Sequence, residues 1–217
     1  MTATADHLEI EVKFFIADTG NLCRCLAGLG ATPHGRVFET NIRFEDREHT
    51  LKAEGKLLRL RRDGTSRLTF KCRPEKEDTD CKVFHELEVT VDDFGAMIAI
   101  LEALGFHQAQ IYEKWRQTYH WRQVEFCLDQ MPFGWFLEIE GPKQDIQAAA
   151  RQLGLAWPER ILANYLAIFD LLRRHYGLPF SDVTFSDFER HPVDIRPLLP
   201  LLQAGGESGL KQEPAGA

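Results

Sequence analysis

The sequence predicts an α+β fold in which an antiparallel sheet curls or closes into a barrel, with a few helices on its outside. Two observations lead to this prediction. Many short segments alternate between apolar and charged residues, as strands with one polar face do, and turn-forming segments separate most of them. Three helical segments each carry an apolar stripe, which needs an apolar sheet face to pack against.

The first predicted strand is the segment LEIEVKF near the N-terminus, where Glu9, Glu11 and Lys13 alternate with four apolar residues. A short helix follows, with an N-cap at Asp18 or Thr19 and a Leu-Gly dipeptide at its end. This succession of a Glu-x-Glu strand, a short helix and a Leu-Gly dipeptide occurs three times. The acidic pairs are Glu9/Glu11, Glu86/Glu88 and Glu138/Glu140. The recurrence indicates repeated strand-plus-helix units in one fold rather than three separate domains.

Four more predicted strands have a charged face, and their charged residues are Arg59 and Arg61, Lys71, Lys114 and Arg116, and Asp129. On any single strand, a charged face is most simply a solvated surface. Surface strands, however, usually mix Thr, Ser, Gln and Lys instead of stacking Arg-x-Arg or Glu-x-Glu. If the helices cover the outside of a closed sheet, the charged faces point into the lumen, where the charges must pair or bind ions.

The predicted lumen combines two kinds of charge. Its acids are hard oxygen ligands of the kind that Mg²⁺ and Mn²⁺ take. Its cations offer guanidinium forks and ammonium groups suited to phosphate oxygens. Together they favour a site for a metal-chelated polyphosphate. A barrel of mutually neutralising charges is the alternative, although it gives no reason for the clustering of charges by sign.

Whole-chain properties argue against several other functions. The net charge of −7, from 26 Lys and Arg against 33 Asp and Glu, argues against a nucleic-acid partner. The sequence has no long apolar run, so we expect no membrane span. Five cysteines form an odd set without zinc-binding spacing, which favours reduced thiols in a cytoplasm. The sequence leaves a homodimer open.

The C-terminal region is less regular. The apolar periodicity predicts a helix from Glu159 to Tyr176. Residues 178–202 contain enough apolar side chains to dock on the body, but their prolines argue against a regular element. The composition of residues 203–217 predicts a disordered tail. We therefore expect a main domain over residues 1–177, a docked extension and a tail.

The charged motifs follow one another in a definite order: Glu9-x-Glu11-x-Lys13, Arg59-Leu60-Arg61, Lys71, Glu86-x-Glu88, Lys114-x-Arg116, Asp129 and Glu138-x-Glu140. This ordered set resembles the signature of the CYTH superfamily, the triphosphate tunnel metalloenzymes. They include class IV adenylyl cyclases, thiamine triphosphatases and inorganic triphosphatases. The resemblance covers most of the chain, and it implies an eight-stranded antiparallel tunnel that holds a triphosphate with one or two divalent metals, Mg²⁺ or Mn²⁺.

The resemblance also implies roles for single residues. The metal-coordinating acids look like Glu9, Glu11, Glu138 and Glu140, with Asp129 in addition. The phosphate-binding cations look like Lys13, Arg59, Arg61, Lys71, Lys114 and Arg116, and catalysis would centre on Glu9, Glu11 and Lys13. Glu86 and Glu88 look like tunnel acids that hold a second metal, orient water or meet the organic end of a substrate. One departure is visible: where members often have Tyr-Phe-Asp, this chain has Arg43-Phe44-Glu45, and Arg43 reads as an ordinary surface residue.

Three functions agree with this resemblance. A metal-dependent triphosphatase, releasing orthophosphate from inorganic or thiamine triphosphate, is favoured because it needs only the groups that the sequence shows. A class IV adenylyl cyclase, which makes cyclic AMP and pyrophosphate from ATP, would also need an adenine pocket that no segment identifies. A non-catalytic module that binds polyphosphate or nucleotide is the third, and the complete set of acids argues against it.

Overall fold

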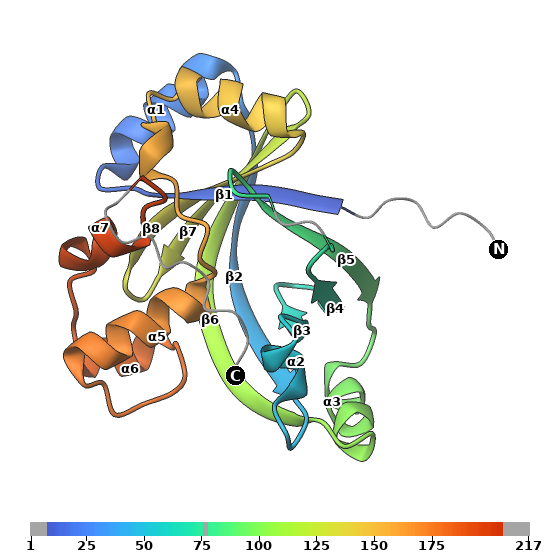
Figure 1. Ribbon diagram of the computed structural model, residues 1–217. Helices are drawn as coiled ribbons and strands as arrows, with labels where there is room; N and C mark the ends of the chain where they lie inside the picture. The colour runs from blue at the N-terminus through green and yellow to red at the C-terminus, as the bar shows by residue number, and fades with distance from the viewer. Residues whose placement is uncertain (1–7, 76–77, 206–217) are drawn as a thin grey trace.

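The computed structural model describes residues 8–75 and 78–205, and its core is a closed barrel of eight strands (Figure 1). The strands are β1 (Leu8–Phe15), β2 (Thr32–Glu45), β3 (Leu57–Arg62), β4 (Ser66–Cys72), β5 (Lys82–Thr90), β6 (His107–Trp121), β7 (Val124–Met131) and β8 (Gly134–Glu140). Around the barrel they follow the order β1-β5-β4-β3-β2-β6-β7-β8, and every neighbouring pair is antiparallel. The predicted closed antiparallel barrel is therefore confirmed.

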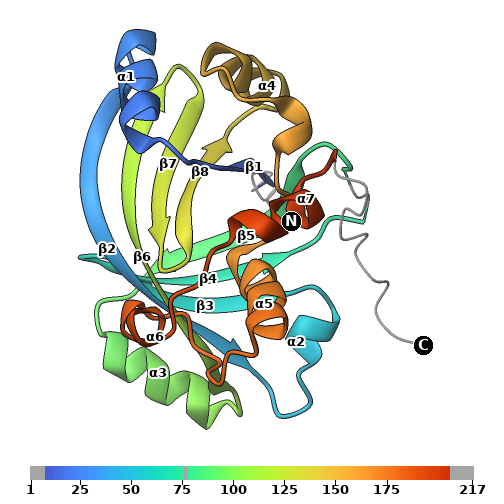
Figure 2. The same ribbon diagram turned by 90° about the vertical axis from the view of Figure 1, so that its left-hand side faces the viewer.

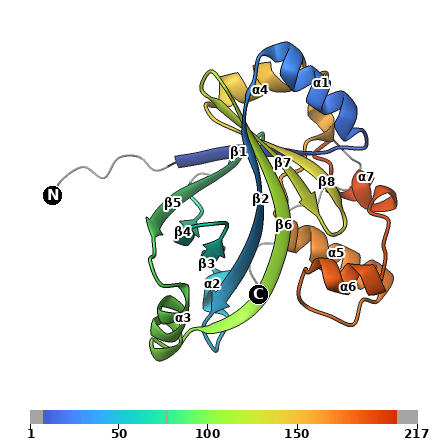
Figure 3. The ribbon, with the colours of Figure 1, turned by 180° about the vertical axis from the view of Figure 1, so that it is seen from behind.

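Two long strands give the barrel its height. β2 and β6 pair along nearly their whole lengths, with register shifts at two points, and Figure 3 shows them side by side along the back. Alternation alone does not predict the length of β2, because Pro33 and Gly35 interrupt it. Pro33 lies next to one of the two shifts, where the pairing of the strands is irregular anyway.

Helices α1 (Thr19–Leu29) and α4 (Lys143–Gln152) cover one end of the barrel (Figure 2). Their apolar stripes pack on the outward faces of β1, β7 and β8 in a cluster that includes Val12, Phe126 and Ile139. The side chain of Asp18 caps α1 by accepting a hydrogen bond from the Asn21 N–H at 2.8 Å. Because these apolar residues face outward, the charged residues that alternate with them on the strands face the lumen.

Helix α3 (Phe94–Ala103) covers a second part of the outer surface. Its residue Leu101 packs with Ile42, Phe44 and Leu60 of β2 and β3. Helix α2 (Thr50–Ala53) is a single turn after β2, and its Leu51 and Lys52 N–H groups donate to the Glu45 carboxylate at 2.9 and 3.0 Å. Glu45 is thus a buried structural acid rather than part of the lumen chemistry.

Residues 157–205 form the remaining cover. They contain two 3₁₀ turns, Trp157–Glu159 and Arg196–Leu198, and the helices α5 (Tyr165–Tyr176), α6 (Phe185–Arg190) and α7 (Leu199–Leu202). These pack against Met131, Phe133 and Phe136 at the ends of β7 and β8. Within the described residues, no helix is long and apolar enough to cross a lipid bilayer. The five cysteines are all unpaired.

Two expectations about this region are wrong in detail. The helix expected from Glu159 begins only at Tyr165, where the Asn164 side chain accepts from the Ala167 N–H at 2.8 Å as an N-cap. Before it, Ile161 runs extended and its N–H donates to the Lys13 carbonyl at 2.7 Å. Residues 178–202, for which no regular element was expected, contain the short helices α6 and α7, because their prolines occupy first-turn or connecting positions.

The expectation of a disordered tail from residue 203 is wrong for residues 203–205. Gln203 bridges to Ile161, and the Ala204 and Gly205 N–H groups donate to the Arg160 and Pro158 carbonyls, both at 2.8 Å. Residues 206–217, the rest of the expected tail, lie outside the described residues.

Candidate active site

The barrel encloses a charged cavity of about 450 Å³. The inward faces of all eight strands contribute to its lining, β2 through Arg43. Every residue expected in the site from the sequence lines this cavity except Asp129, which lies fully buried behind the lining. The alternation of the strands therefore brings together acids and cations that are up to 131 residues apart, as for Glu9 and Glu140.

Asp129 anchors one wall of the cavity. Arg116 binds its carboxylate with two parallel hydrogen bonds, Nε to Oδ1 at 2.7 Å and a terminal nitrogen to Oδ2 at 2.6 Å. Lys114 Nζ and the Tyr165 hydroxyl also donate to Oδ2, each at 2.9 Å. A carboxylate with four charged or polar donors is satisfied on both oxygens, so it fixes Lys114 and Arg116 at the cavity wall.

Lys13 lies beside this wall and is almost completely buried. Its ammonium is 2.9 Å from Glu138 Oε1 and 3.9 Å from Glu11 Oε1, and it lies 4.5 Å from the centre of the Tyr165 ring. Arg116 also pairs with Glu138. Burial disfavours the charged forms of Glu138 and Lys13. Even so, Lys13 and Arg116 hold the pKa of Glu138 well below its usual range, and Glu138 raises the pKa of Lys13. This ammonium therefore stays charged at neutral pH.

The opposite wall carries a second cation set. Arg59 donates to the Thr69 hydroxyl at 3.1 Å, and Arg61 lies 3.3 Å from Glu88. Lys71 pairs with Glu86 at 2.8 Å and also with Glu9. Burial, the largest single effect, lowers the pKa of Lys71, but Glu9, Glu11 and Glu86 together outweigh it and the net shift is upward. Cations thus line two facing sides of the cavity.

Carboxylates crowd at one end of the cavity. Glu140 lies directly across the sheet from Glu11 on β1 and from Glu125 on β7. Burial, then Glu9 and Glu11, raise the pKa of Glu140 to about 8. Burial and Glu11 likewise raise the pKa of Glu9. Glu11 differs, because Lys82 at 2.5 Å and Lys13 overcome burial and lower its pKa to about 2.

This acidic end fits a divalent cation by its chemistry. Among the described residues Glu140 forms no ion pair, and like charges directly opposite each other destabilise a sheet. A bound cation would supply the missing positive charge, and the donors are the carboxylate oxygens that Mg²⁺ and Mn²⁺ prefer. In residues 8–75 and 78–205, no group of three His, Cys, Asp or Glu side chains is arranged closely enough to hold a metal ion as the side chains stand. Glu138 and Asp129, also expected as ligands, are held by Lys and Arg.

Several residues of the site were missed from the sequence. Glu39, Tyr112 and Tyr165 contact the predicted cations, and Arg67 adds another cation to the lining. Glu39 alternates with Asn41 and Arg43 in FETNIRFE, so the pattern that revealed the other strands could have revealed it. Tyr165 belongs to an apolar helix stripe, where nothing marks its hydroxyl as functional.

Arg43 corrects one expectation. It was expected to be an ordinary surface residue, but it lines the cavity and its guanidinium donates to the buried Glu45 at 3.0 Å. Glu45 holds Arg43 at the lumen side of β2 because both residues alternate on the same face of the strand.

Comparison with known proteins agrees with this architecture. The CYTH domain matches residues 7–160, well over half of the chain. A Methanocaldococcus jannaschii protein named "Putative adenylate cyclase MJ0240" is 30% identical over 141 residues, which are 64% of this chain and 79% of that protein. The structure of the PH1012 protein of Pyrococcus horikoshii OT3 is 32% identical, covers 72% of this chain and 96% of its own, and superposes with a TM-score of 0.62.

A more distant structure shares the fold. It is a Vibrio parahaemolyticus protein, also described as a putative adenylate cyclase, with 18% identity and a TM-score of 0.67 over 76% of this chain and 99% of its own. The family match, the two relatives of about 30% identity and the closed charged barrel agree. The chain therefore belongs to the CYTH domain family.

Proposed function

We propose that the protein is a divalent-metal-dependent triphosphatase that releases orthophosphate from inorganic triphosphate or thiamine triphosphate. One observation carries the proposal: six cations from four strands and a crowded set of carboxylates line the same cavity. The cations are Lys13, Arg59, Arg61, Lys71, Lys114 and Arg116. A polyanion bound with a divalent cation needs both kinds of group, and either kind alone would serve a simpler ligand.

The two cationic walls would bind the phosphate oxygens from opposite sides. Arg116 and Lys114 project from β6, and Arg59 and Arg61 project from β3. Guanidinium groups match phosphate oxygens as bidentate forks, and ammonium groups act as point charges. Because Asp129 already holds Lys114 and Arg116 in place, these groups need little reorganisation when negative charge develops in the transition state.

Lys13 would act as an electrostatic group rather than as a base. Its pKa is raised, mainly by Glu138 against the effect of burial, so it keeps its proton at neutral pH. A fixed buried ammonium stabilises negative charge more strongly than an exposed one. Glu86 and Glu88 pair with Lys71 and Arg61, and would hold these cations in position when no substrate is bound.

Glu9, Glu11 and Glu140 would hold Mg²⁺ or Mn²⁺. Glu138 and Asp129 would be further acids of this metal site. When bound, the metal supplies positive charge to the phosphate oxygens and favours the ionised form of a nucleophilic water. The raised pKa of Glu140, due to burial and to Glu9 and Glu11, supports this assignment, since among the described residues Glu140 has no cation paired with it.

An adenylate cyclase is the second candidate, because the Methanocaldococcus jannaschii relative carries that name at 30% identity. A cyclase needs a site for adenine as well as for the triphosphate. The cavity lining is dominated by charged residues, and the hydroxyls of its two tyrosines, Tyr112 and Tyr165, contact Arg59 and Asp129. This lining favours a substrate that consists mostly of phosphate.

The test separates the candidates by their products. The purified protein is incubated with Mg²⁺ or Mn²⁺ and with inorganic triphosphate, thiamine triphosphate or ATP, and orthophosphate, pyrophosphate and cyclic AMP are resolved. We expect orthophosphate from one of the first two substrates, at least 100-fold slower in the E9Q and E138Q variants. The matched control is Glu189→Gln, an exposed acid of α6, which should keep full activity. Cyclic AMP with pyrophosphate would overturn the proposal in favour of a cyclase, and tight binding without any product would indicate a binding module.

A further inference from the structure

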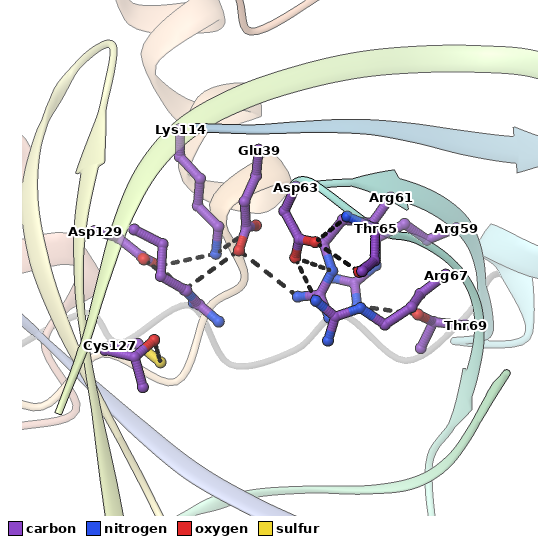
Figure 4. A network of polar contacts seen from close by, with 12 residues as sticks. Glu39, Arg59, Arg61, Asp63, Thr65, Arg67, Thr69, Lys114, Cys127 and Asp129 are labelled. Carbon is purple, nitrogen blue, oxygen red and sulfur yellow. Dashed lines mark hydrogen bonds and ion pairs between the residues drawn. The ribbon is translucent and has the colours of Figure 1, made fainter. Parts of the chain in front are cut away.

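Glu39 is a buried acid in the middle of the phosphate-binding cations. It lies on β2, directly opposite Lys114 of β6, and its side chain is 1% exposed. Its carboxylate oxygens lie 3.4 Å from Lys114 Nζ, 3.7 Å from an Arg61 terminal nitrogen and 3.8 Å from Arg116 Nε. Figure 4 shows Glu39 between Lys114 and Asp129 on one side and Arg59, Arg61 and Arg67 on the other. It is thus the acid that links the two cationic walls.

These contacts are ionic without being hydrogen bonds. All three distances exceed the usual range for an N–H donor to a carboxylate, and Glu39 Oε2 has no hydrogen-bond partner among the described residues. The donors of Lys114 and Arg116 point to Asp129, and Arg61 points to Glu88. Glu39 therefore adds negative charge to the cation set without occupying its donors.

The carboxylate is ionised under ordinary conditions. Burial alone would raise its pKa, but Lys114, Arg116 and Arg61 lower it to about 2. A structural counter-ion would be expected to form short hydrogen bonds, as Asp129 does with the same two residues. The contrast between the two acids indicates that Asp129 positions the cations and that Glu39 adjusts their charge.

We propose that Glu39 is a specificity-determining residue that weakens the binding of metal-free phosphoanions and so favours the metal-chelated triphosphate. The inference rests on the proposed function of this cavity. A free triphosphate carries more negative charge than its complex with a divalent cation, so a fixed negative charge beside the binding cations repels the free form more strongly. The same repulsion limits the retention of product phosphate.

The test measures the binding of inorganic triphosphate, pyrophosphate and orthophosphate by calorimetry in excess EDTA. We expect Glu39→Gln to bind metal-free triphosphate about tenfold more tightly than the wild-type protein, since one like charge is removed near the anion. Glu39→Asp, which keeps the charge, should stay within about threefold of wild type. The matched control is Glu45→Gln, which removes the same charge from the same face of β2 but contacts Arg43 and α2 instead of the phosphate-binding cations.

A purely structural role predicts the opposite sign. If Glu39 only held the cations in place, E39Q would bind triphosphate more weakly, and this result or an unchanged affinity would overturn the inference. Circular dichroism establishes that each variant is folded. If E39Q does not fold, Asn41→Asp adds a charge opposite Arg61, and its affinity should fall about tenfold; an unchanged affinity would count against the inference. If neither the wild-type protein nor E39Q binds any of the three anions, in EDTA or with Mg²⁺ present, the proposed function is overturned as well.

Discussion

Asp129 is a single buried residue that positions the cations of one wall of the site. Four donor groups from three residues of β6 and α5 converge on a carboxylate with no exposed surface. Replacing Asp129 by Asn keeps the shape but leaves Lys114 and Arg116 with too little negative charge. We expect D129N to lower the free energy of unfolding by about 3 kcal/mol, the usual cost of breaking a buried ion pair from one side. Urea denaturation measures this loss.

The same variant should respond unusually to ligand. Inorganic triphosphate supplies the negative charge that D129N lacks, so its addition should raise the unfolding midpoint of D129N by more than that of the wild-type protein. The exposed acid variant E189Q serves as the reference for an ordinary charge change. Equal ligand-induced shifts in D129N and wild type would mean that the anion does not bind beside Lys114 and Arg116.

Glu140 makes stability depend on pH. Its pKa is raised from 4.5 to about 8, first by burial and then by Glu9 and Glu11, so between these values the folded protein holds a proton that the unfolded chain releases. The stabilising contribution is complete below pH 4.5 and is lost as the pH rises through 8. After allowance for solvent screening, the loss is on the order of 2 kcal/mol.

Denaturant midpoints at pH 5 and pH 8 in EDTA test this dependence. We expect the wild-type protein to lose stability between the two values and E140Q to lose about 2 kcal/mol less, because the amide cannot ionise. Saturating Mn²⁺ should remove most of the difference at pH 8, since the metal takes the place of the proton. Parallel pH profiles of the two proteins would contradict the assignment of this titration to Glu140.

At the scale of elements, the strands could be predicted far better than the helices. Alternation assigned Glu9, Glu11 and Lys13 to the inner face because a period of two leaves no other choice on a half-buried strand. The start of α5 could not be predicted, because Ile161, Leu162 and Ala163 are apolar residues that suit a helix equally well. Ile161 instead forms a β-bridge with Lys13, a contact between distant segments that no local pattern reveals.

Residues 178–205 are predicted to be part of the folding unit, although the family match ends at residue 160. Five of their apolar side chains are at most 5% exposed, and they share one cluster with Phe133 and Phe136 of the barrel. The five are Val183, Phe188, Ile195, Leu198 and Leu202. At about 2 kcal/mol for each, their burial contributes about 10 kcal/mol, which is comparable with the whole stability of a typical domain.

A chain that ends at Gly177 should therefore fail to unfold cooperatively and should aggregate on purification. The matched control ends at Gly205 and keeps every contact described for the segment. Thermal unfolding followed by circular dichroism distinguishes the two chains. If the shorter chain showed a sharp transition within a few degrees of the control, residues 178–205 would be a dispensable extension.

For the molecule as a whole, the sequence predicts which side chains share the lumen but not which of them pair. Closure of the barrel follows from helices that need apolar sheet faces and from charges that need an interior. The pairing depends on the register between strands far apart in the chain. Arg116 lies opposite Asp129 because β6 and β7 pair in this register. Glu39 comes close to Arg116 only because β2 pairs with β6. Composition and alternation carry no information about such registers.

The closed barrel should also be stable without metal. Eight ladders of backbone hydrogen bonds and three apolar clusters hold the fold, and the acidic end lies at the cavity rather than in any of these clusters. We expect excess EDTA to abolish phosphate release while the far-ultraviolet circular dichroism spectrum and the single cooperative transition remain. The unfolding free energy should fall only by the mass-action term, about 3 kcal/mol for metal at 100 times its dissociation constant. Loss of the β-sheet spectrum in EDTA, as in domains that fold around a metal, would instead make the cation a structural part of the barrel.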